Sequence, residues 1–104
     1  MNMDNVPIAY RLRTSVQRAL LGEVDARIVA VTCGVVGSTI KVRTYVDAPV
    51  TAADMNRVQV VSSEVITDFA DEGFAIEEEC LSVGRTKPEV LDFWAFYRAD
   101  GQLS

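Results

Sequence analysis

The stretch Arg27-Ile-Val-Ala-Val-Thr-Cys-Gly-Val-Val-Gly-Ser-Thr-Ile-Lys-Val-Arg-Thr-Tyr-Val46 decides the fold of this chain. Residues 27–35 are rich in β-branched side chains, which favour strands. A turn over residues 36–38 follows, in which Gly37 can take a positive φ angle. Apolar and polar side chains then alternate over residues 39–46, so that one face of the second strand holds Ile40, Val42, Thr44 and Val46. The stretch therefore predicts a β-hairpin with one buried face.

A helix is expected on each side of this hairpin. Residues 8–21 carry apolar side chains at helical spacing and end before Gly22, a residue that commonly follows a helix. Residues 52–71 follow Thr51, which together with Asp54 is close to a capping box. The face of this second helix that is expected to be buried holds Met55, Val58, Ser62, Val65, Ile66 and Phe69. The opposite face is expected to hold Arg57, Glu64, Asp68 and Asp71, with Val61 and Glu72 on its flank.

Two further strands complete the pattern. Residues 74–83 and 91–98 are typical of strands, and a loop over residues 84–88 joins them. The order α-β-β-α-β-β predicts an α+β fold, namely a two-layer sandwich with two helices on one face of a mainly antiparallel four-stranded sheet. Because no linker or change of composition divides the chain, residues 1–104 are expected to form a single domain.

The charge of the chain is concentrated in one segment. The 104 residues include 15 acidic and 10 basic side chains, which gives a net charge of −5 and an isoelectric point of about 4.6. Between Arg57 and Arg85 there are seven acidic residues and no basic one: Glu64, Asp68, Asp71, Glu72, Glu77, Glu78 and Glu79. Without this acidic block the chain would be slightly basic. Charge concentrated in this way suits a surface that binds a basic partner, although an acidic helix face also serves solubility alone.

Periodicity divides the acidic block into a helical part and a strand part. Glu77 and Glu79 share one side of the third strand. If the second and third strands are neighbours, this pair faces Lys41 and Arg43 in cross-strand ion pairs; a solvated surface, a partner site or an acid–base pair are the other interpretations. Glu78 falls on the apolar side of the strand, where an unpaired carboxylate is costly. It therefore indicates a bulge, a position at the rim of the sheet, or a contact with an arginine of the first helix.

Residues that carry most enzyme chemistry are missing from the sequence. It contains no histidine and no phosphate-binding, dinucleotide-binding or nucleophile motif, so we expect no enzyme activity, no metal and no cofactor. A small-molecule or enzyme site around Glu78 and Cys80 is a third hypothesis. Cys33 and Cys80 are expected to be reduced thiols, with a disulfide only if their strands are adjacent.

The acidic composition also restricts the partners and the compartment. The isoelectric point of about 4.6 disfavours nucleic-acid binding, and the three arginines of the first helix are expected to solvate that helix or to pair with the acidic block. No apolar run approaches the ~18–20 residues that a membrane span needs. The first residues lack the pattern of a signal peptide, so the protein is expected in the cytoplasm.

Aromatic side chains gather in the last strand, in the run Trp94-Ala-Phe-Tyr97. Alternation predicts Phe93 and Tyr97 on one face, and Trp94 and Phe96 are then expected on the other. If helices cover one face of the sheet, the candidates for an exposed aromatic patch are Tyr45, Trp94 and Phe96. Loops can cover such a patch; alternatively it mediates a homodimer, since Trp and Tyr are frequent in interface hot spots. The second functional hypothesis is accordingly a homodimeric structural or regulatory module without catalytic activity.

Several segments of the chain resemble a family of short bacterial proteins. The segments are Arg13-Thr-Ser-Val-Gln-Arg-Ala-Leu-Leu-Gly-Glu-Val24, Val42-Arg-Thr-Tyr-Val-Asp47, Ser63-Glu-Val-Ile-Thr-Asp-Phe69 and Trp94-Ala-Phe-Tyr-Arg98. The resemblance spans about residues 9–98 and is carried by a pattern of helix, hairpin and tail. Some proteins with this pattern resemble immunity proteins of contact-dependent growth inhibition and other polymorphic toxin systems.

This resemblance implies a protein that binds a cognate toxin domain and blocks its active site, with no catalytic residue of its own. Toxins of these systems are frequently nucleases with basic clefts, which an acidic inhibitor suits. The first functional hypothesis is therefore an immunity protein that neutralises a toxin. The residues expected to bind the toxin are Glu64, Asp68, Asp71, Glu72, Glu77 and Glu79.

Overall fold

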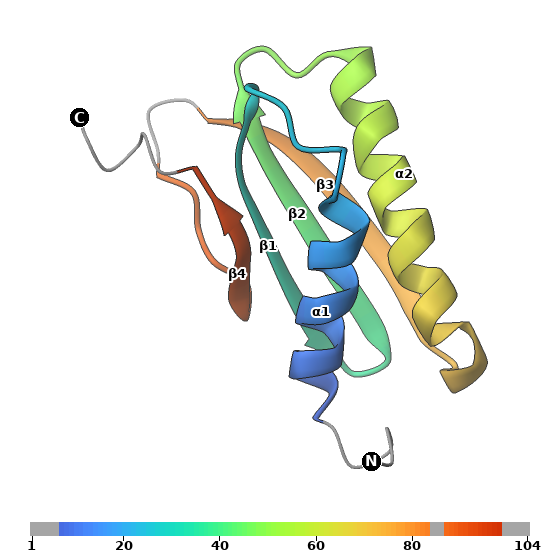
Figure 1. Ribbon diagram of the computed structural model, residues 1–104. Helices are drawn as coiled ribbons and strands as arrows, with labels where there is room; N and C mark the ends of the chain where they lie inside the picture. The colour runs from blue at the N-terminus through green and yellow to red at the C-terminus, as the bar shows by residue number, and fades with distance from the viewer. Residues whose placement is uncertain (1–6, 84–86, 99–104) are drawn as a thin grey trace.

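The computed structural model describes residues 7–83 and 87–98, in which two helices pack on one face of a four-stranded sheet (Figure 1). The elements in chain order are α1 (Ile8–Leu20), β1 (Ile28–Val36), β2 (Thr39–Asp47), α2 (Ala52–Phe69), the 3-10 helix η2 (Ala70–Glu72), β3 (Ala75–Val83) and β4 (Phe93–Tyr97). The predicted α+β class and the predicted order of elements are confirmed, with each predicted boundary within two residues of the structure.

Local signals in the sequence account for these boundaries. The Oγ1 atom of Thr51 accepts the backbone N–H of Asp54 at 3.1 Å, and the Asp54 carboxylate accepts the N–H of Thr51 at 2.9 Å. This reciprocal capping box starts α2 at the predicted position. Gly37 in the hairpin turn and Gly73 after η2 have φ angles of +60° and +78°, which other residues rarely adopt.

The sheet is mixed, so the prediction of a mainly antiparallel sheet is wrong. Its strand order is β3-β2-β1-β4, with β1 antiparallel to both β2 and β4 but β3 parallel to β2. The reason lies in the connection between β2 and β3. Helix α2 carries the chain back along the sheet, so the next strand enters from the same end as β2 and runs in the same direction.

The core lies between the helices and the sheet. Its largest fully buried apolar side chains are Phe69, Leu12, Ile40, Val16, Val31, Val42, Val46 and Val65. Burial of each such side chain contributes about 1.5–3 kcal/mol relative to an exposed position. The face predicted for α2 is wrong at two residues, because Val61 is 2% exposed and Met55 is 39% exposed. Helix α2 packs against α1 as well as the sheet, which displaces its buried stripe toward α1.

Before β4, residues 87–92 pass over the open face of the sheet, opposite the helices. The Tyr45 hydroxyl donates to the carbonyl of Glu89 at 3.2 Å and accepts the N–H of Glu89 at 3.0 Å. The N–H of Leu91 donates to Thr32 Oγ1 at 2.8 Å. Because Tyr45 and Thr32 both belong to the open face, residues 87–92 cover part of it. Of the loop predicted over residues 84–88, residues 84–86 lie outside the described residues.

This passage ends by closing the edge of β1. The N–H of Asp92 donates to the carbonyl of Cys33 at 2.9 Å, and the Asp92 carboxylate accepts the N–H of Val35 at 3.0 Å. Gly34 makes room for this arrangement, since a Cβ atom there would lie 2.9 Å from Asp92 Cγ. Strand β4 then continues along β1.

Candidate partner-binding surface

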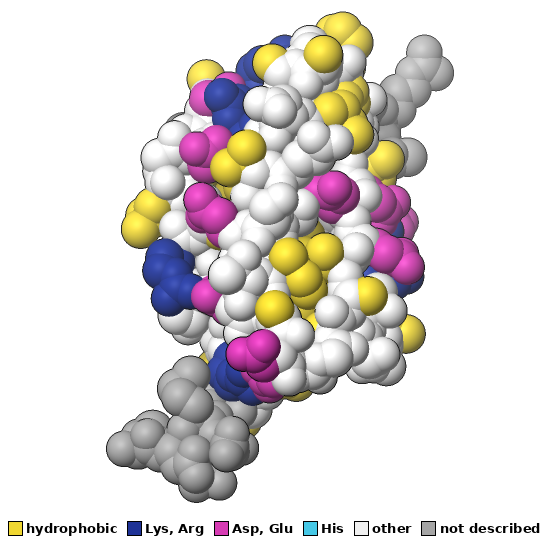
Figure 2. Space-filling model, turned by 90° about the vertical axis from the view of Figure 1, so that its right-hand side faces the viewer, with side chains coloured by type: hydrophobic (Ala, Val, Ile, Leu, Met, Phe, Trp, Pro, Cys, Tyr) yellow, Lys and Arg dark blue, Asp and Glu magenta, His cyan; other side chains and the backbone are white. Residues whose placement is uncertain are grey.

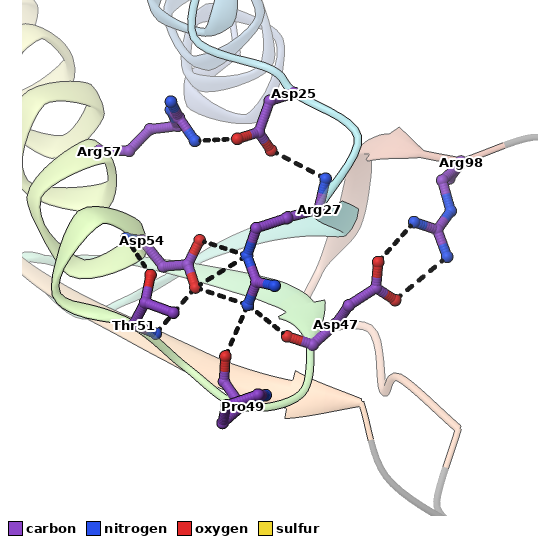
Figure 3. Close-up of polar contacts among 8 residues, drawn as sticks. All are labelled: Asp25, Arg27, Asp47, Pro49, Thr51, Asp54, Arg57 and Arg98. Atoms are coloured by element: carbon purple, nitrogen blue, oxygen red, sulfur yellow. Dashed lines mark hydrogen bonds and ion pairs between the residues drawn. The ribbon is translucent and has the colours of Figure 1, made fainter.

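A network of ion pairs fixes the start of α2 against the sheet (Figure 3). The guanidinium of Arg27 lies 2.8 Å from the carboxylate of Asp54 and donates to the carbonyls of Asp47 and Pro49, each at 2.6 Å. Asp54 is buried, and its hydrogen bonds from Arg27 hold the pKa of its carboxyl well below the usual value. The network therefore ties the end of β2, the following loop and the first turn of α2 into one unit.

Two further arginines extend this network. Arg57 of α2 pairs with Asp25, in the segment between α1 and β1. Arg98 lies 3.1 Å from the Asp47 carboxylate and donates to the carbonyl of Ala26 at 2.8 Å. These contacts hold the ends of several elements together, so the network serves the fold rather than a partner.

Two acidic residues of α2, Glu64 and Asp68, lie on the side of this helix that faces α1. Asp68 accepts a hydrogen bond from Ser15 at 2.6 Å and pairs with Arg18. Glu72, in η2, pairs with both terminal nitrogens of Arg11, and this contact lowers the pKa of the Glu72 carboxyl. The expected pairing of helix-one arginines with the acidic block is thus confirmed at two positions.

The third arginine of α1 has a different contact. The guanidinium of Arg13 lies over the ring of Phe93, 4.8 Å from its centroid. It therefore contacts β4 instead of the acidic block.

Two acidic residues of this region form no ion pair within the described part of the chain. Glu64 lies one helical turn before Asp68, and Asp71 lies in η2. Both side chains are exposed, and within the described residues neither forms a hydrogen bond or ion pair. Their charges are therefore available to another molecule.

The glutamates of β3 form the predicted cross-strand pairs. Lys41 is aligned with Glu77 and Arg43 with Glu79, with nitrogen–oxygen distances of 4.0 and 3.1 Å. All of these side chains lie on the open face of the sheet. They can pair because β2 and β3 are neighbours. The conditional prediction of ion pairs is confirmed.

Glu78 lies at the rim of the sheet, one of the three predicted alternatives. Strand β3 is an edge strand, so the Glu78 side chain is exposed although it points to the helical side. Its carboxylate accepts a hydrogen bond from the hydroxyl of Ser62 in α2. Glu78 has no cationic partner among the described residues.

The outer face of α2 carries no charge. Figure 2 shows a central band of hydrophobic and neutral side chains, with carboxylates along both of its sides and Lys or Arg side chains among those on the left. The exposed residues of this face, here called the α2 ridge, are Met55, Asn56, Gln59, Val60, Ser63 and Thr67. Sequence reasoning assigned the exposed face to Arg57 and the acidic residues, and it missed the ridge. The signal was present in the sequence, since residues 55–67 contain only two charged side chains, Arg57 and Glu64.

The aromatic patch differs from the prediction because β4 contains an irregularity. Val31 is aligned with Phe96 but Thr32 with Trp94, so one residue of β4 is unmatched. Such a bulge reverses the alternation beyond it. Phe96 therefore packs into the core, and its assignment to an open-face patch is wrong.

The other two residues of the predicted patch, Trp94 and Tyr45, contact other residues of the chain. Trp94 contacts Tyr97 edge to face, with ring centroids 4.9 Å apart. Tyr45 is 7% exposed beneath residues 87–92. Tyr97, which is 42% exposed, takes the place of Phe96 beside Trp94 on the open face.

The two thiols and the carboxylates give little sign of reaction chemistry. Burial raises the pKa of Cys33 to about 12, which keeps this thiol protonated and unreactive. Strand β2 lies between the strands that hold Cys33 and Cys80, and both cysteines are free. In the described ranges no three His, Cys, Asp or Glu side chains are placed to hold a metal ion. Neither described α-helix is both long and apolar enough to cross a membrane.

Comparison with known families gives this surface a context. Residues 9–100 match the model of a family described as MafI2 immunity protein, which confirms the resemblance to immunity proteins of polymorphic toxin systems. No match was found among curated proteins. The matched range extends from α1 through β4 and thus includes every helix and strand of the described residues. The chain belongs to the MafI2 immunity protein family.

Proposed function

We propose that this protein neutralises a cognate bacterial toxin by binding it through the side of the molecule formed by α2 and β3, without catalysing a reaction. Membership of an immunity protein family supports toxin binding. The observation that carries the choice of surface is an excess of negative charge beside an uncharged ridge. We call the α2 ridge together with the acidic block the α2–β3 surface.

The charge of this surface is only partly compensated. Four of the seven carboxylates of the acidic block pair with Arg11, Arg18, Lys41 and Arg43. The other three, those of Glu64, Asp71 and Glu78, have no ion pair within the described residues. Exposed ion pairs contribute only about 0–1 kcal/mol, so the paired carboxylates can also turn to cations of a partner at small cost.

The α2 ridge has the composition of an interface centre. Protein interfaces are depleted of charge in their buried centre and polar at their rim. On this molecule uncharged residues of α2 occupy the centre, and carboxylates border them on both sides (Figure 2). Burial of the ridge then supplies affinity, and the bordering carboxylates attract and orient a basic partner.

The kind of toxin that we propose for this surface is a nuclease domain. Nucleases bind the phosphate backbone of their substrates and carry Lys and Arg side chains for that purpose. Carboxylates on both sides of a neutral ridge can occupy such phosphate-binding positions. The toxin domain inhibited in this way is prevented from binding its substrate.

The test is a titration with the cognate toxin domain, whose gene we expect immediately upstream of the gene for this chain. We expect Glu64→Lys and Asp71→Lys each to weaken binding at least fivefold, and we expect binding to weaken as salt is raised. The matched control is Glu89→Lys, an exposed reversal on the opposite side of the sheet, with less than a twofold effect. Unchanged affinity in both variants removes the acidic residues from the mechanism, and no binding by the natural protein overturns the proposed function.

A further inference from the structure

We propose that the outer edge of β3 accepts a basic β-strand of the toxin, which adds to the sheet as a fifth strand. This inference rests on the proposed function, because the partner that supplies the strand is the toxin. It specifies which backbone groups of β3 contact the toxin, which family membership alone does not indicate.

The direction of the β3 backbone groups follows from its pairing with β2. The N–H of Ala75 donates to the carbonyl of Ser38 at 2.9 Å, and Ala75 is aligned with Thr39. In a parallel ladder, residues alternate between those that bond to the neighbouring strand and those that point away from it. Glu77, Glu79 and Leu81 therefore bond to β2 like Ala75. The residues that turn their N–H and C=O groups outward are Ile76, Glu78, Cys80 and Ser82.

The edge is long and regular enough to serve as a template. Strand β3 has nine residues, and its alignment with β2 runs without interruption from Ala75 to Val83. It contains no proline. In the described part of the chain no strand lies beyond it. An extended peptide that adds to such an edge gains main-chain hydrogen bonds, which is a recurrent mode of protein recognition.

The charge on β3 selects the kind of strand that can add. Glu77 and Glu79 project to the open face, and Glu78 projects to the helical side, so carboxylates border the edge on both faces. A second copy of β3 that paired in antiparallel fashion about Glu78 would set these carboxylates opposite one another, which is unfavourable. A strand with Lys or Arg at the facing positions meets opposite charge instead. The edge is thus closed to the protein itself and open to a basic partner.

A proline variant and an alanine variant of Glu78 together test the backbone contact. Glu78→Pro and Glu78→Ala both remove the carboxylate, but only proline also removes the outward N–H, and proline is tolerated where an edge N–H faces solvent. We expect Glu78→Pro to bind the cognate toxin domain at least tenfold more weakly than Glu78→Ala. Thermal unfolding of both variants shows whether Glu78→Pro is folded.

Amide hydrogen exchange of the natural protein provides a test that needs no variant. On addition of the toxin domain, we expect the amides of Ile76, Glu78, Cys80 and Ser82 to become protected. The amides of Glu77, Glu79 and Leu81 are expected to be protected already in the free protein. Toxin binding without new protection of the outward amides overturns the strand inference and leaves the proposed function standing. Absence of toxin binding overturns the proposed function itself.

Discussion

The two edges of the sheet are protected in different ways. Strand β4 has five residues, carries an irregularity in its pairing and is preceded by Asp92, whose side chain and N–H both bond to β1. Strand β3 has nine regularly paired residues, and three consecutive glutamates are the feature that protects it from pairing with another chain. Proteins use short strands, bulges and charges to keep sheet edges from pairing with other chains. Short length and irregular pairing disfavour any added strand at β4, whereas charge at β3 disfavours strands of like charge only. The β3 edge therefore remains selective.

Loss of the Asp54 carboxylate is expected to have the largest effect, because Asp54 anchors the crossover that brings β3 beside β2. Asp54→Ala removes the capping box and leaves Arg27 without its buried partner, so we expect the free energy of unfolding to fall by about 3 kcal/mol. Chemical denaturation measures this change. The control is Asp71→Ala, an exposed acid, with an expected change within about 0.5 kcal/mol. Equal effects in the two variants would mean that the Arg27 network does not hold the crossover.

Lowering the pH is expected to remove the contribution of the Asp54 carboxylate to the free energy of unfolding gradually. The pKa of Asp54 is lower in the folded protein than in the unfolded chain, where it is about 3.9. A lowered pKa contributes stability that is fully present above the unfolded value and is lost as the pH falls below it. Denaturation of the natural protein between pH 7 and pH 3 is therefore expected to show a steeper loss than that of Asp54→Asn. Parallel curves would contradict this assignment.

The contacts of Asp92 with β1, which precede the β4 edge, can be disturbed by a side chain at Gly34. Because a Cβ atom there lies 2.9 Å from Asp92 Cγ, Gly34→Val is expected to displace Asp92 and to cost about 2 kcal/mol of stability. The amide of Val35, which donates to Asp92, is expected to exchange faster with solvent. The double variant Gly34→Val/Asp92→Ala should recover part of the stability, since the clash is gone. No recovery would show that the cost of valine arises elsewhere.

The charge on the open edge can be removed without altering its geometry. The variant Glu77→Gln/Glu78→Gln/Glu79→Gln is expected to self-associate at least tenfold more strongly than the natural protein, because like charges no longer face each other across paired β3 edges. Sedimentation at increasing protein concentration measures this association. The control, Glu64→Gln/Asp71→Asn/Glu89→Gln, removes the same charge from other positions. Identical sedimentation of the two variants would show that net charge, and not the β3 edge, governs association.

Much of the fold could be predicted because its signals are local. The capping box of Thr51 and Asp54, the hairpin turn at Gly37 and the helical spacing of residues 8–21 each lie within a short segment. The pairing of Lys41 and Arg43 with the β3 glutamates was also predictable once two strands were assumed to be neighbours.

Other features depend on contacts between distant segments. The unmatched residue in β4 that turns Phe96 into the core has no sequence signal of its own, since alternation alone assigns Phe96 to the other face. The orientation of α2 depends on its packing against α1, so Asp68 faces Arg18 and the uncharged residues face solvent. For this reason the acidic residues were identified from the sequence but the α2 ridge was not.

The position of β4 has a consequence for the chain while it is being synthesised. Every other described helix and strand leaves the ribosome first, and β1 lacks its second neighbour until β4 has followed. Until then the edge of β1 beside the apolar residues Val31 and Cys33 stays unpaired in the nascent chain. Unpaired edges of this kind make partly folded chains prone to aggregation. Pairing of β4 with β1 is thus the step that covers this edge, and it follows the synthesis of every other described helix and strand.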